Sequence, residues 1–160
     1  MSRLLAFAAL APFAATCAQA PEQSAGAEPV CVRAEIVPGF ESFGKPEAGA
    51  PALGKAVALT MKSAESSAAK GERPFKPGTY EGHWLRTVAK AGDYRIALSQ
   101  AAWIAVRRTM DEVDSAAHGH GPACSGIRKI VTFPLKPGSY HLNLSEAKEP
   151  GIVVAVAPGA

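Results

Sequence analysis

The sequence predicts an all-β protein, built as an antiparallel β-sandwich or a jelly roll. About eight short segments carry apolar residues at every second position, and turns rich in Gly and Pro separate them at intervals of about ten residues. One strand-turn-strand unit occurs twice. The best candidate helix, at 62–70, has no apolar stripe, so we expect a surface loop there.

The repeated unit covers residues 84–101 and 130–147, which align without gaps at an offset of 46 residues. Gly92 aligns with Gly138, and Tyr94 aligns with Tyr140. We expect each unit to be a β-hairpin and both glycines to have a positive φ, as a type II turn at Lys136-Pro137-Gly138 requires. Alternation predicts a buried face in each unit, made of Tyr94, Ile96, Leu98, Val131, Phe133, Leu135, Tyr140, Leu142 and Leu144.

Similar patterns place the remaining elements along the chain. Pro134 cannot donate a ladder hydrogen bond, so its strand is expected at an edge or with a bulge. The continuous apolar run 102–106 predicts a strand buried on both faces, with Trp103 in the core and Trp84 more exposed. Further strands are expected at 30–37, 56–61, 115–118 and 152–156, and loops at 40–51, 107–114 and 119–126.

The N-terminus predicts export. Arg3 precedes an apolar run, and small residues follow it, which is typical of a signal peptide over 1–20. A flexible leader at 21–29 and a single domain at 30–160 complete the expected organisation. Acylation of Cys17 and an uncleaved membrane anchor are weaker alternatives, since the residues before Cys17 do not fit the usual pattern and the apolar run is short. We expect a periplasmic or secreted protein without a transmembrane segment in the mature chain.

Removal of the signal peptide leaves two cysteines, Cys31 and Cys124. In an oxidising compartment such a pair forms a disulfide. The sequence therefore predicts a Cys31–Cys124 bond.

Two segments, AGDYRIALSQAAWIAV and AHGHGPACSGIRKIVTFPLKPGSY, carry a resemblance. They resemble a group of short secreted proteins from sphingomonad-like bacteria, some of which bear the name homogentisate 1,2-dioxygenase. The resemblance covers roughly residues 55–145 and implies no established activity, and the motif that holds iron in the true dioxygenase has no match here. The pattern AGDYRIAL is also similar to bacterial pre-peptidase C-terminal domains, which implies a β-sandwich accessory module.

The segment between the two units contains the best candidates for a functional site. His118 and His120 flank one glycine, so in an extended chain both rings lie on one side and begin a metal site. Arg128 adds a cation for a carboxylate or an anionic glycan. We expect His118, His120 and Arg128 to bind a ligand, and a metal would need a further acidic ligand from Asp111, Glu112 or Asp114.

Other constellations are weaker. Arg107 and Arg108 would form a basic patch with Arg128 and Lys129 if their strands adjoin. The net charge of +3 and the absence of basic runs with interleaved aromatics argue against a nucleic-acid partner. We expect a binding or accessory module for a small anionic or glycan ligand, without a cofactor unless a metal binds. A metal-dependent oxidoreductase using the two histidines and a structural envelope protein are the alternatives.

Overall fold

The computed structural model describes residues 31, 35–66 and 76–159. The predicted signal peptide, the leader and half of the predicted strand at 30–37 lie outside these residues. Cys31 and Glu35–Val37, the described part of that strand, are not in a β-strand. The described chain contains no helix that is long and apolar enough to cross a membrane.

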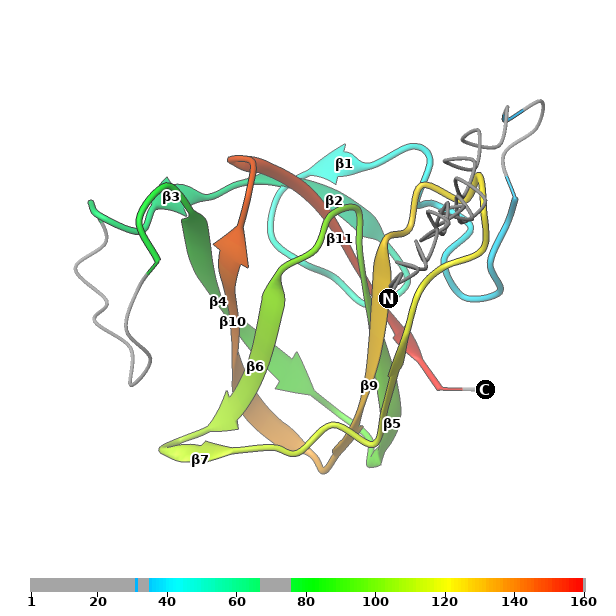
Figure 1. The fold of residues 1–160 in the computed structure, drawn as a ribbon. Helices are drawn as coiled ribbons and strands as arrows, with labels where there is room; N and C mark the ends of the chain where they lie inside the picture. Colours follow the sequence, from blue (N-terminus) through cyan, green and yellow to red (C-terminus); the bar gives the residue numbers. More distant parts are fainter. Residues whose placement is uncertain (1–30, 32–34, 67–75, 160) are drawn as a thin grey trace, which may run out of the picture.

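The fold is the predicted all-β sandwich of two sheets (Figure 1). Six strands form one sheet in the order β1-β2-β11-β5-β9-β8, and five form the other in the order β3-β4-β10-β6-β7. All strand pairs are antiparallel except β1 and β2. The strands of the six-stranded sheet are Glu47–Ala48 (β1), Ala56–Thr60 (β2), Gly151–Pro158 (β11), Gly92–Leu98 (β5), Lys129–Leu135 (β9) and Ala117–Gly119 (β8). Those of the five-stranded sheet are Lys62–Ser63 (β3), Tyr80–Val88 (β4), Gly138–Ala147 (β10), Trp103–Arg108 (β6) and Asp111–Glu112 (β7).

The two repeated units are not hairpins. The first unit crosses from β4 in the five-stranded sheet to β5 in the six-stranded sheet, and the second crosses back from β9 to β10. Each unit is therefore an arch between the sheets, and the ladder hydrogen bonds join the units to each other. Gly138 pairs with Val88, and Gly92 pairs with Leu135. The hairpin prediction is wrong because a turn between two alternating strands looks the same in sequence whether the strands pair or face each other.

The predicted inward faces are buried between the sheets. All nine apolar residues predicted from the two units belong to the main core, together with Val57, Leu59 and Met61 of the predicted strand at 56–61. Tyr94 donates its hydroxyl proton to the carbonyl of Lys90, and Tyr140 does the same to Lys136, at 2.8 and 2.9 Å. These matching bonds, each to the residue four positions earlier, show that the sequence repeat is a structural repeat.

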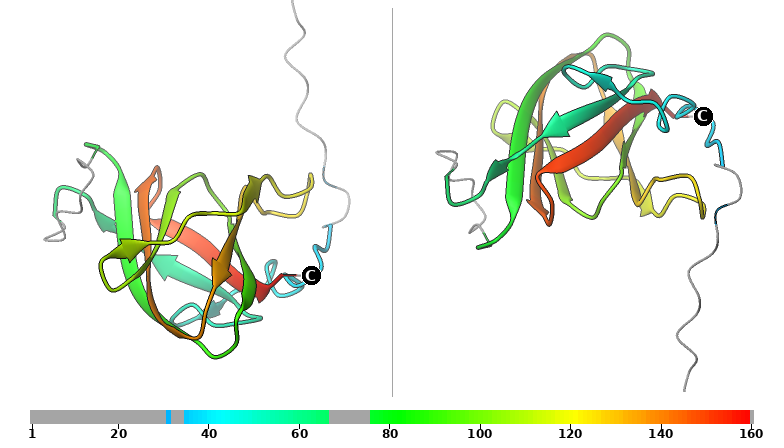
Figure 2. Two further views of the ribbon diagram at one scale, coloured as in Figure 1. Left: turned by 90° about the horizontal axis from the view of Figure 1, so that it is seen from below. Right: turned by 90° about the horizontal axis from the view of Figure 1, so that it is seen from above.

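The outer faces of the two sheets differ. Small residues such as Ala97 and Ala155 on the six-stranded sheet allow Phe40 and Phe43 to pack over it as a second buried cluster. Figure 2 shows the segment before β2 beside the C-terminal end of β11. The five-stranded sheet instead exposes Leu85 on its outer face. Leu85 therefore stays uncovered, in contrast to the small residues under Phe40 and Phe43.

Candidate functional site

The three predicted site residues lie at the surface, with His118 in β8 and His120 and Arg128 in the loop between β8 and β9. His118 pairs with Val131 in the sheet, and His118, His120 and Arg128 are all exposed. A ring nitrogen of His120, Nδ1, lies 2.9 Å from the carbonyl oxygen of Arg128, so this imidazole N–H donates to the backbone. The structure thus brings His120 to the main chain of Arg128.

The predicted disulfide between Cys31 and Cys124 is present, with Cα atoms 5.3 Å apart and a sequence separation of 93. Closing a loop of that length stabilises the fold by about 4 kcal/mol in the chain-entropy model. Ser125 adds local order, since its hydroxyl donates to the Pro122 carbonyl and accepts from the N–H of Ile127. The loop is therefore a pinned segment, as the sequence predicts.

The metal prediction gains no third ligand from the structure. The described residues contain no group of three or more His, Cys, Asp or Glu side chains that could hold a metal ion. Glu112, one of the candidate acids, is in an ion pair with Arg107 at 3.1 Å. A metal at His118 and His120 stays a prediction.

The condition for a basic patch is not met, since β6 and β9 belong to different sheets. Lys129 lies over the ring of Trp103 at the start of β6, 5.8 Å from its centroid, whereas Arg107 and Arg108 lie at the end of that strand. Four or five residues of extended chain separate the two groups by roughly 13–17 Å. Lys129 donates to the carbonyl of Ala102, and burial lowers the pKa of its ammonium group.

The exposures of Trp103 and Trp84 are the reverse of those predicted from the sequence. Trp103 is 39% exposed, because it shares the outward face of β6 with Arg107. Trp84 is half-buried and packs against the main core. Burial on both faces of β6 begins only at Ile104, so the prediction of Trp103 in the core is wrong.

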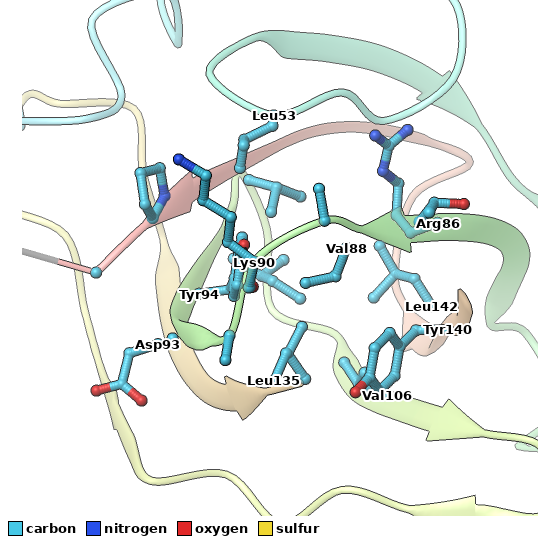
Figure 3. A pocket seen from close by; sticks show the side chains of 18 residues that line it. Leu53, Arg86, Val88, Lys90, Asp93, Tyr94, Val106, Leu135, Tyr140 and Leu142 are labelled. Carbon is cyan, nitrogen blue, oxygen red and sulfur yellow. Dashed lines mark hydrogen bonds between the residues drawn. The ribbon is translucent and has the colours of Figure 1, made fainter. Parts of the chain in front are cut away.

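A cavity of about 650 Å³ opens at the end of the sandwich under the first arch (Figure 3). This end is opposite the loop at 120–128, since Arg128 precedes the first residue of β9 and the last residue of β9, Leu135, lines the cavity. The cavity walls come from both sheets and are apolar, with Val88, Ile96, Val106, Leu135, Leu142 and Val156 among them. A cavity of this size lies within the range of small-molecule sites, roughly 300–1,000 Å³.

The two arch tyrosines line the cavity without adding a donor to it. Both hydroxyl groups donate to the backbone carbonyls described above. Each hydroxyl has one proton, so neither is left to bind a guest. The deep part of the cavity therefore favours an apolar guest.

Three charged side chains, Arg86, Lys90 and Asp93, line the cavity. Arg86 and Lys90 lie on the same side of the cavity as the exposed Leu53, whereas the carboxylate of Asp93 lies on the other side (Figure 3). Arg86 is in phase with Trp84 and Val88 on the inward face of β4, and it donates to the carbonyl of Pro51 at 2.5 Å. That carbonyl has no net charge, so the bond positions the guanidinium without neutralising it.

Sequence reasoning missed this cavity. The walls were predicted as core, correctly, but an unfilled volume between two sheets has no sequence signature of its own. One signal was present: Arg86 occupies an inward position of an alternating strand, where an apolar residue is expected.

A second arrangement lies on the outer face of the five-stranded sheet. Nε2 of His83, on β4, is 2.7 Å from Nδ1 of His141, on β10. The ring planes differ by 17° and the centroids are 4.9 Å apart. One imidazole N–H thus donates to the unprotonated nitrogen of the other ring.

Comparisons of the chain with family models, with curated proteins and with solved structures find no match.

Proposed function

We propose that this protein binds an amphiphilic molecule, with an apolar chain in the end cavity and an anionic head group at its mouth. The observation that carries the proposal is the apolar cavity of about 650 Å³ with Arg86 and Lys90 at one side of its opening. The apolar walls supply affinity and the two cations select the head group. A long-chain carboxylate has this chemistry.

Export is part of the proposal. A signal peptide is expected at 1–20, and the Cys31–Cys124 disulfide fits an oxidising compartment. An exported carrier that keeps an apolar chain out of water needs a covered cavity and no cofactor. A metal-dependent oxidoreductase that uses His118 and His120 stays the alternative.

Chain length gives the first test. Each methylene that moves from water into the cavity contributes about 0.8 kcal/mol, or about a fourfold change in Kd. Titration of purified protein with saturated carboxylates from hexanoate to palmitate should show this rise until the cavity is full, followed by a plateau. Equal affinities across the series would contradict binding in the cavity.

The repeat supplies a matched pair for the head group. Lys90 and Lys136 occupy equivalent exposed positions, but only Lys90 lines the cavity. Lys90→Gln should weaken binding of a carboxylate by about two- to fivefold, the range of an exposed ion pair, and leave the matching alcohol unaffected. Lys136→Gln should change neither. Equal losses in the two variants would show that net charge acts, and not the mouth.

Blocking the mouth is the third test. Ala91 is exposed and lines the cavity, so Ala91→Trp places a bulky ring at the opening. Ala101→Trp, at the other end of β5 on an exposed site, is the control. We expect loss of binding for the first variant only, with unchanged circular dichroism for both. Full binding by Ala91→Trp would overturn the proposal.

A further inference from the structure

The geometry points to a transition-metal site formed by His83 and His141 on the outer face of the five-stranded sheet. It is separate from the end cavity and from the loop that carries His118 and His120. Two imidazole nitrogens from neighbouring strands meet there at 2.7 Å. Imidazole is a preferred ligand of Cu²⁺, Ni²⁺ and Zn²⁺.

The strands hold the two rings in place. β4 and β10 pair without interruption from Gly82–Leu144 to Val88–Gly138, and this pairing places His83 opposite Asn143 and His141 opposite Leu85. The two histidines are diagonal neighbours on one face, which is within reach of long side chains. His83 is exposed and His141 is half-buried, so an ion in solvent can reach both. A sheet gives such a site more precision than a loop.

The nitrogen separation is close to what a metal requires. At a metal–nitrogen distance of about 2.0–2.1 Å, two ligands lie about 2.9 Å apart at a right angle and about 3.3 Å apart at the tetrahedral angle. The observed 2.7 Å is nearer to the first value. Right angles occur in the square-planar and tetragonal sites that Cu²⁺ and Ni²⁺ favour. Small rotations of the two rings would turn both lone pairs toward a common point.

The chemistry of the histidine pair also allows a metal ion to replace the shared proton. The metal-free pair shares one proton between two nitrogens. A neutral histidine can move that proton to its other nitrogen, and the freed lone pair then binds the cation in its place. Within the described chain no third His, Cys, Asp or Glu joins a metal-binding group, so water or a small ligand completes the coordination. The site should bind Cu²⁺ more tightly than it binds Ni²⁺ or Zn²⁺.

Copper titration of the purified protein tests the site. Calorimetry should show one Cu²⁺ per chain, and electron paramagnetic resonance should show coupling to imidazole nitrogens. Loss of even an indirect partner of a metal site costs about tenfold or more in affinity, so His83→Ala and His141→Ala should each weaken Cu²⁺ binding at least that much. The control is the double variant His118→Ala/His120→Ala, in which the site at His83 and His141 should keep its Cu²⁺ affinity.

Each outcome decides the inference. Unchanged Cu²⁺ affinity in both His83→Ala and His141→Ala would overturn it, as would loss of binding in the control alone. If an alanine variant unfolds by circular dichroism, His83→Phe replaces it, since the aromatic ring keeps the surface packing and removes the nitrogens. Carboxylate binding in the cavity should not respond to any of these substitutions, which separates failure of this site from failure of the proposed function.

Discussion

The two arches share a design but differ in how firmly they are closed. Both cross between the sheets, both begin the second strand with a glycine of positive φ, at +156° for Gly92 and +150° for Gly138, and both tie a tyrosine hydroxyl to the carbonyl four residues earlier. In the second arch the Tyr140 hydroxyl also accepts from the N–H of Lys136, at 3.1 Å.

The surroundings of the two glycines also make the second arch the more tightly packed one. A Cβ at Gly138 would lie 3.3 Å from the guanidinium group of Arg108, whereas a Cβ at Gly92 would have nothing within 4 Å. The first arch lies over the cavity, and its connecting residues Ala89, Lys90 and Ala91 are exposed. Both arches lie at the same end of the sandwich, since Gly138 pairs with Val88 and Gly92 with Leu135. The repeat therefore supplies a common frame, and the contacts that are not shared make the second arch more tightly packed than the first.

Substitution of the glycines should have the largest effect. A φ near +150° is almost restricted to glycine, and an L-residue there costs on the order of 1–3 kcal/mol. Gly138→Val should lower the free energy of unfolding more than Gly92→Val does, because Arg108 must also move. Urea titration of the two variants gives their free energies of unfolding. A larger loss at Gly92 would show that the first arch is the more constrained of the two.

Removal of the tyrosine hydroxyls should have the second largest effect on stability. A hydrogen bond contributes about 0.5–1.5 kcal/mol net. Tyr140→Phe loses two such bonds and should cost about 2 kcal/mol, whereas Tyr94→Phe loses one and should cost about 1 kcal/mol. Equal losses would mean that the contact with the Lys136 N–H adds no stability, and the arches would then be closed alike.

Much of the fold could be predicted because alternation reports which face of a strand is buried. It cannot report which strand pairs with which, so the pattern predicts hairpins where the structure has arches. Turn residues are similarly ambiguous. Lys76-Pro77-Gly78 forms a turn with φ +69° at Gly78, close to a type II turn, but the same three residue types at 136–138 form an arch with φ +150°. Context from the two sheets decides between them.

The candidate sites were harder to predict because they depend on distances across the sheets. His118 and His120 are neighbours in sequence, which made them visible, while His83 and His141 are 58 residues apart and meet only after β4 pairs with β10. The end cavity depends on the space that buried side chains leave unfilled. The disulfide was predictable because removal of the expected signal peptide would leave two cysteines and thus one pairing.

The smallest effect concerns the middle residue of the arches. Ala91 aligns with Pro137, so Ala91→Pro gives the first arch the Lys-Pro-Gly sequence of the second. Where the backbone accepts proline, the substitution stabilises by about 0.4–1 kcal/mol, mainly by restricting the unfolded chain. We expect a gain of this size in the free energy of unfolding, and Pro137→Ala should lose a similar amount. Destabilisation by Ala91→Pro would show that the two arches differ in backbone conformation at this position.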